Sequence, residues 1–70
     1  MLSKDIGKML RDRRKSLKIT QPDVADLARI SVNTLYKIER GEANPTIDIL
    51  EKIAEVLGLE FRLEAKKIKL

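Results

Sequence analysis

Residues 31–40, SVNTLYKIER, interleave apolar side chains with side chains that can hydrogen-bond or carry charge. If this stretch is a helix, Leu35 and Ile38 face inward, because they lie three residues apart. Five residues then lie on its outer side or at its edge: Val32, Asn33, Thr34, Tyr36 and Lys37. Side chains of these kinds can read base edges, since asparagine pairs with adenine, lysine reaches guanine and valine packs on a thymine methyl.

Each of these side chains also has a plainer interpretation. An exposed Asn, Lys or Val on a helix is usually only part of the surface. Tyr36 could contact a phosphate or cover the core, and Lys37 could reach a phosphate instead of a base. The chemistry of this stretch therefore depends on the elements that position it.

Apolar spacing and capping residues predict four helices, at about 4–17, 21–28, 32–40 and 47–57. Thr20, Ser31 and Thr46 are suitable N-caps for the last three helices, and Gly41 and Gly58 are suitable helix stops. In the first helix Leu2, Ile6, Met9, Leu10 and Leu17 supply the apolar spacing, and in the second Val24, Leu27 and Ala28 do so. The second and third helices are so close that they predict a helix-turn-helix unit, which is a DNA-reading geometry.

The residues after the fourth helix follow a different period. Apolar and charged side chains alternate along LEFRLEA, residues 59–65, which indicates a half-buried strand over 59–66. A single strand cannot satisfy its own backbone, and its simplest partner is the same strand of a second copy, antiparallel across a two-fold axis. This pairing would make a dimer interface of Leu59, Phe61, Leu63 and Ala65. The alternative is an extended tail that packs on the helices. Residues 67–70 are expected to form a basic tail.

The composition excludes several classes of function. Seventy residues make one domain, with no cysteine or histidine, so we expect no metal site and no cofactor. The chain also lacks a phosphate-binding loop and room for a concave pocket, so we do not expect an enzyme. It has no secretory signal and no apolar run that could span a membrane, so we expect a cytoplasmic protein without a membrane partner.

The positive charge of the chain is concentrated near its start. Residues 1–20 hold seven basic and two acidic residues, whereas residues 21–59 hold four basic and seven acidic ones. A basic segment beside a less basic body can bind a polyanion, or it can simply be a solvated helix face.

Residues 4–58 resemble the phage-repressor, Cro-type (XRE) helix-turn-helix domain. The resemblance rests on the apolar positions Val24, Ala28, Ile30, Leu35 and Ile38, on the small Ala25, on Thr20-Gln21 and Ser31, and on IERG followed by NP. It implies an all-α, compact four-helix lambda-repressor-like domain over residues 1–58, to which the strand is added. It also implies a homodimeric repressor that binds an inverted-repeat operator in double-stranded DNA. Arg29 departs from the family, which commonly has glycine in this turn.

The resemblance and the helix ends together suggest further sites. Gln21 lies at a helix N-terminus, which favours an anion, and the matching Gln of related repressors contacts phosphate. The other expected phosphate contacts are Ser31, Arg40, Asn44 and Thr46, with Lys18 and Arg29 as weaker candidates. In the family an Arg at the place of Arg14 pairs with a Glu at the place of Glu39, which implies a structural ion pair.

The ending LGLEFRLEAKK resembles that of HipB-type antitoxins, which carry a short C-terminal strand after the same domain. This narrower resemblance implies a HipA-like serine/threonine kinase toxin as partner and repression of the operon that encodes both. The competing hypothesis is a protein-interaction module of the same fold that binds a partner protein without reading DNA. Salt-dependent DNA binding would distinguish the two.

Overall fold

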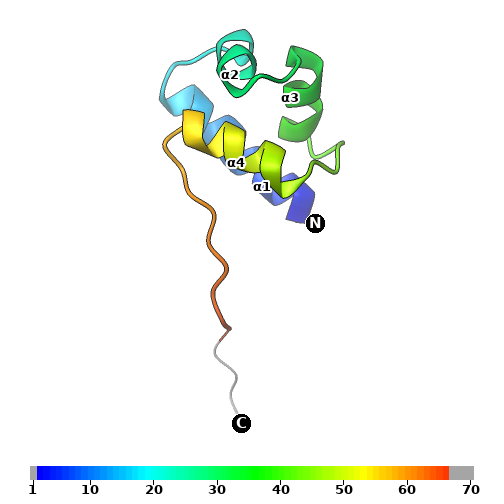
Figure 1. Cartoon of the computed structure of the whole chain (residues 1–70), viewed down its shortest axis with the longest axis vertical. Helices are drawn as coiled ribbons and strands as arrows, with labels where there is room; N and C mark the ends of the chain where they lie inside the picture. The colour runs from blue at the N-terminus through cyan, green and yellow to red at the C-terminus, as the bar shows by residue number, and fades with distance from the viewer. Residues whose placement is uncertain (1, 67–70) are drawn as a thin grey trace.

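The computed structural model describes residues 2–66, which form four helices and an extended C-terminal segment (Figure 1). The helices are α1 (Leu2–Ser16), α2 (Gln21–Ala28), α3 (Val32–Glu39) and α4 (Ile47–Val56). This arrangement confirms the predicted all-α, four-helix fold. The largest difference from the predicted bounds is at the start of α1, which begins two residues earlier than expected.

The starts of the last three helices are fixed by side-chain caps. The Thr20 hydroxyl oxygen accepts a hydrogen bond from the Asp23 N–H at 3.3 Å. Ser31 and Thr46 accept in the same way from the backbone N–H three residues later, at 3.0 and 3.2 Å. Replacing such a cap by alanine typically costs about 1 kcal/mol. The caps therefore explain why these three helices start where the sequence predicts.

The core lies between α2, α3 and α4, with a smaller contribution from α1. Its fully buried large side chains are Val24, Leu35, Ile53 and Leu57. Four residues that we expected to supply apolar spacing in the first two helices are exposed, namely Leu2 (73%), Met9 (65%), Leu17 (40%) and Leu27 (65%). In α2 the buried positions are 24, 25 and 28, so position 27 falls at the edge of the inward arc and faces solvent.

α1 packs closely against α3 at a glycine, Gly7. A Cβ atom on Gly7 would collide with the backbone carbonyl oxygen of Ile38 and would lie 2.9 Å from that of Glu39. Because backbone atoms cannot move aside as a flexible side chain can, only glycine fits here without separating the two helices. This contact places α1 beside the C-terminal end of α3.

The C-terminal segment differs from its prediction. Residues 59–66 form no helix and no strand within the described chain, and Figure 1 shows the segment leading away from the four helices. A strand requires a paired neighbour, and no second extended segment lies beside it in residues 2–66. Leu59, expected in a dimer interface, instead packs partly buried on its own core, and its N–H donates to the Ala54 carbonyl at 2.8 Å. The predicted basic tail, 67–70, lies outside the described residues.

Candidate nucleic-acid interface

The turn between α2 and α3 has the sharp geometry that a helix-turn-helix requires. Arg29 ends α2 in the left-handed conformation (φ 59°, ψ 43°), and the Ile30 N–H donates back to the Ala25 carbonyl at 2.9 Å. A left-handed non-glycine residue costs about 1–2 kcal/mol. The turn therefore carries strain at the position where the sequence departs from the family pattern. Lys18, after α1, has the same conformation (φ 57°).

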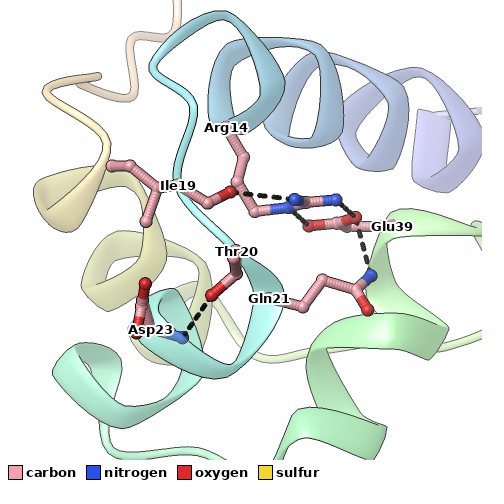
Figure 2. A network of polar contacts seen from close by, with 6 residues as sticks. All are labelled: Arg14, Ile19, Thr20, Gln21, Asp23 and Glu39. Atoms are coloured by element: carbon pink, nitrogen blue, oxygen red, sulfur yellow. Dashed lines mark hydrogen bonds and ion pairs between the residues drawn. The ribbon is translucent and has the colours of Figure 1, made fainter.

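A buried polar network joins α1, α2 and α3 (Figure 2). The guanidinium of Arg14 donates to both carboxylate oxygens of Glu39, at 2.7 and 2.9 Å, and also to the Ile19 carbonyl at 3.0 Å. The Gln21 side-chain amide donates to the same carboxylate at 3.0 Å. The side chains of Arg14 and Glu39 are only 11% and 2% exposed. The ion pair expected from the resemblance is thus present as a bidentate, largely buried contact.

This network fixes the direction of α3. Hydrogen bonding to Glu39 raises the pKa of Arg14 above its ordinary value, against the opposing effect of burial, so the guanidinium stays charged. No buried side-chain nitrogen or oxygen among the described residues lacks a partner. A bidentate pair of this kind fixes orientation as well as distance. The end of α3 is therefore tied to both α1 and the start of α2.

Sequence reasoning missed the Gln21 part of this network. We expected Gln21 to contact phosphate, whereas its side-chain nitrogen donates to Glu39. The side chain is only partly buried, and the second N–H and the carbonyl oxygen of its carboxamide make no hydrogen bond within residues 2–66. Only the proximity of α2 to α3 reveals the contact, because the two residues are 18 positions apart in the chain.

The outer side of α3 faces away from the core and is exposed. Val32, Asn33, Tyr36 and Lys37 are exposed, whereas Leu35 and Ile38 are buried as expected. Thr34 differs from the others, since it is half-buried and its hydroxyl lies 2.7 Å from that of Ser31. The structure therefore brings four of the five predicted base-reading side chains together on one exposed face. Their roles in reading bases stay predictions.

The predicted phosphate contacts lie around the ends of the helices. Ser31 and Thr46 use their hydroxyl oxygens as caps, but a hydroxyl that accepts at a cap can still donate its hydrogen. Asn44 is exposed in the loop before α4. Arg40 lies 5.4 Å from the centre of the Tyr36 ring and pairs with Glu42 at 3.1 Å, an exposed contact that raises the pKa of Arg40. If α3 reads bases, these side chains are the predicted contacts to the neighbouring DNA phosphates. Their contacts to phosphate stay predictions.

Two other kinds of site are not found in the described chain. Within residues 2–66 no group of three or more acidic, histidine or cysteine side chains could hold a metal ion. Nor is any of the helices in that range long and apolar enough to cross a membrane.

Comparison with known proteins assigns the chain to a family. The helix-turn-helix family model matches residues 10–63. A Methanococcus maripaludis protein, named provisionally as an HTH-type transcriptional regulatory protein, is 45% identical over 53 residues, which are 76% of this chain and 16% of that protein. The immunity repressor protein of Bacillus phage phi105 is 36% identical over 55 residues, which are 79% of this chain and 38% of the repressor. The chain thus spans only a part of each relative.

A solved structure shares the fold. The crystal structure of the clp gene regulator ClgR from Corynebacterium glutamicum superposes with a TM-score of 0.82 at 27% identity. The match covers 84% of this chain and 63% of ClgR. The sequence match and the shared arrangement of helices lead to one conclusion: the chain belongs to the XRE-type helix-turn-helix family.

Proposed function

We propose that this chain is a sequence-specific, double-stranded DNA-binding transcriptional regulator that acts as a homodimeric autorepressor. α3 enters the major groove, with Val32, Asn33, Tyr36 and Lys37 at base edges and Thr34 at the margin of this set. Phosphate contacts come from the residues at the helix ends: Gln21, Ser31, Arg40, Asn44 and Thr46. The names of the relatives, a transcriptional regulatory protein and an immunity repressor, support this assignment.

One observation carries the proposal. The exposed face of α3 combines an amide, an ammonium group and a phenol, and the opposite side of the helix ends in the buried contact between Glu39 and Arg14. A reading helix must be held in one orientation, because base-edge hydrogen bonds require their donors within a few tenths of an ångström. The network supplies that rigidity without using any of the outward-facing groups.

Fluorescence anisotropy tests the DNA-binding part of the proposal. The full chain is titrated onto a duplex taken from just upstream of its own coding region and onto a scrambled duplex, at two salt concentrations. We expect tighter binding to the native duplex and a fall in affinity as salt rises, because phosphate contacts release counterions. Equal, salt-insensitive affinity for both duplexes would contradict DNA reading and favour a protein-interaction module of the same fold.

The dimeric part of the proposal sets the form of the operator. Two α3 helices related by a two-fold axis meet successive major grooves roughly 34 Å apart, so the operator is an inverted repeat. Residues 59–66 form the dimerisation strand in this proposal, added to a DNA-binding domain at 1–58. The support is the alternation of apolar and charged side chains along the extended segment.

A finer proposal concerns the biological partner. The same segment supports an antitoxin of the HipB type, whose partner is a HipA-like serine/threonine kinase. The test is purification of the tagged full chain from its native cells, followed by a kinase assay of the co-purified fraction. We expect a kinase that arrests growth when it is produced alone. A fraction without kinase activity contradicts the antitoxin role and leaves the DNA-binding proposal standing.

A further inference from the structure

An apolar groove of about 550 Å³ lies where the extended segment leaves the helices. Its walls include Leu2 and Ile6 of α1, Ile47 and Leu50 of α4, and Phe61 and Leu63 of the segment. Leu2 and Ile47 are more than two-thirds exposed, and Leu63 is fully exposed. Apolar side chains gathered in this way around a hollow are typical of a surface that another chain covers.

The backbone beside this groove is also unpaired. After the Leu59 N–H, which donates to Ala54, no backbone hydrogen bond joins residues 60–66 to any other residue of the described chain. Extended backbone with free N–H and C=O groups is a template for a further strand. The groove and the free edge therefore call for the same kind of occupant, an extended chain with apolar side chains on one side.

The side chains of the segment divide between two faces. Arg62 and Glu60 form an ion pair at 3.0 Å, which places both on the same side of the extended backbone. Phe61 and Leu63 alternate with them and line the groove, and Arg62 lies at its margin. The ion pair agrees with the period-2 pattern of the sequence, in which the charged residues 60, 62, 64 and 66 alternate with the apolar residues 61, 63 and 65.

We propose that the occupant is the same segment of a second copy, paired antiparallel so that Leu63 lies on the two-fold axis. The inference rests on the homodimer of the proposed function and fixes its register. In this register Phe61 lies opposite the partner's Ala65, and Leu63 lies opposite the partner's Leu63. These apolar side chains share one face, so the partner's Leu63 and Ala65 cover the groove.

Charge complementarity selects this register. With Leu63 on the axis, Arg62 lies opposite the partner's Glu64, and Glu60 lies opposite the partner's Lys66. Symmetry doubles both pairs, so every charged side chain of residues 60–66 meets the opposite sign. With Arg62 on the axis, two arginines would face each other and Glu60 would oppose the partner's Glu64, and like charges directly opposite are destabilising.

Ladder length disfavours the register with Phe61 on the axis, in which the charges are also favourable. With Phe61 on the axis, Glu60 would oppose the partner's Arg62. The ladder could then run only from 59 to 63, because the Leu59 N–H is already bonded to Ala54 at the end of α4. With Leu63 on the axis the ladder runs from 60 to 66. Compared with the register that has Phe61 on the axis, this ladder has two more paired residues in each strand and two more ion pairs in the dimer.

Cysteine cross-linking of the full chain tests the register, since the sequence has no cysteine to interfere. We expect Leu63→Cys to form a disulfide-linked dimer, because a residue on the axis faces its own copy at a Cα separation that a disulfide can bridge. Phe61→Cys and Ala65→Cys alone are matched controls that should not cross-link, since each lies four residues, roughly 14 Å, from its own copy. A mixture of these two variants should cross-link. Self-linkage of Phe61→Cys or Arg62→Cys, without that of Leu63→Cys, overturns the register.

A charge swap, read by sedimentation equilibrium, provides a second test without cysteine. We expect Arg62→Glu to raise the dimer dissociation constant about tenfold and Arg62→Glu/Glu64→Arg to restore it, because the swapped pair re-forms across the axis. Arg62→Glu/Glu60→Arg should not restore it. Restoration by Glu60→Arg, and not by Glu64→Arg, overturns the register.

Sedimentation of the unmodified chain separates this inference from the proposed function. A stable dimer that neither cross-links at Leu63→Cys nor responds to Arg62→Glu overturns the strand pairing and leaves the homodimer intact. A monomer at all concentrations overturns both, and leaves the groove to the chain's own tail or to another protein. Anisotropy on the same samples reports DNA binding independently of either result.

Discussion

Of the arginine–glutamate pairs within residues 2–66, Arg14–Glu39 and Arg62–Glu60 have the same chemistry and opposite surroundings. Arg14 and Glu39 are 11% and 2% exposed, and their carboxylate also accepts from Gln21. Arg62 and Glu60 are 70% and 74% exposed and have no third partner among the described residues. Because the first pair is buried, it holds α1 and α3 in one relative orientation. Water and salt weaken the exposed second pair, so Arg62 and Glu60 can form ion pairs with other residues instead. The contrast separates the part of the molecule that needs rigidity from the part that is available for pairing.

Breaking the buried pair should give the largest effect on folding. We expect Glu39→Ala to lower the free energy of unfolding by about 3–5 kcal/mol, because Arg14 is left charged and largely buried without its partner. Urea denaturation followed by circular dichroism measures the change. Glu60→Ala is the matched control, and we expect it to change stability by less than about 0.5 kcal/mol. Equal losses in the two variants would refute the distinction between the pairs.

The close approach of α1 to α3 should be almost as sensitive. Gly7→Ala puts a Cβ against the carbonyl oxygens of Ile38 and Glu39, and we expect a loss of about 2–3 kcal/mol. In an exposed helix the same change would stabilise by roughly 0.5–1 kcal/mol. Thermal unfolding shows whether Gly7→Ala lowers or raises the stability of the fold. A stabilised Gly7→Ala variant would show that the helices can separate at no cost.

The outward face of α3 should affect DNA binding without affecting the fold. We expect Lys37→Ala to weaken binding to the native upstream duplex by about 2 kcal/mol, with a smaller loss on a scrambled duplex, because a base contact is lost. Anisotropy titrations measure both, with the exposed Lys52→Ala of α4 as control. An equal loss on both duplexes would make Lys37 a phosphate contact.

The strained turn should give a smaller effect of the opposite sign. We expect Arg29→Gly to stabilise the fold by about 1 kcal/mol, because glycine adopts the left-handed conformation without a Cβ clash. Lys15→Gly, in the exposed last turn of α1, is the matched control and should destabilise by a similar amount. Chemical denaturation of both variants measures the difference. A destabilised Arg29→Gly variant would mean that the arginine side chain contributes more than the turn geometry costs.

The sequence predicted the elements with local causes and missed those with spatial ones. The caps Thr20, Ser31 and Thr46 predict the starts of three helices, because a cap hydrogen-bonds to a backbone N–H only three residues away. The contacts of Gly7 and Gln21 join residues far apart in the chain, and no local pattern marks them. Met9 and Leu27 were expected on apolar helix faces, because spacing alone does not determine which side of a helix meets its neighbours. Residues 59–66 form no strand in the single chain described, because a strand needs a paired neighbour, and the proposed dimer takes that neighbour from a second copy.

Hydroxyl-radical footprinting of the full chain on the upstream DNA tests the central claim most directly, namely that a rigidly held α3 from each of two copies reads the operator. The account predicts two protected regions, centred roughly 10 base pairs apart and related by a two-fold axis, and weaker protection of both with Lys37→Ala. One asymmetric protected region, or protection that is independent of sequence, would contradict it.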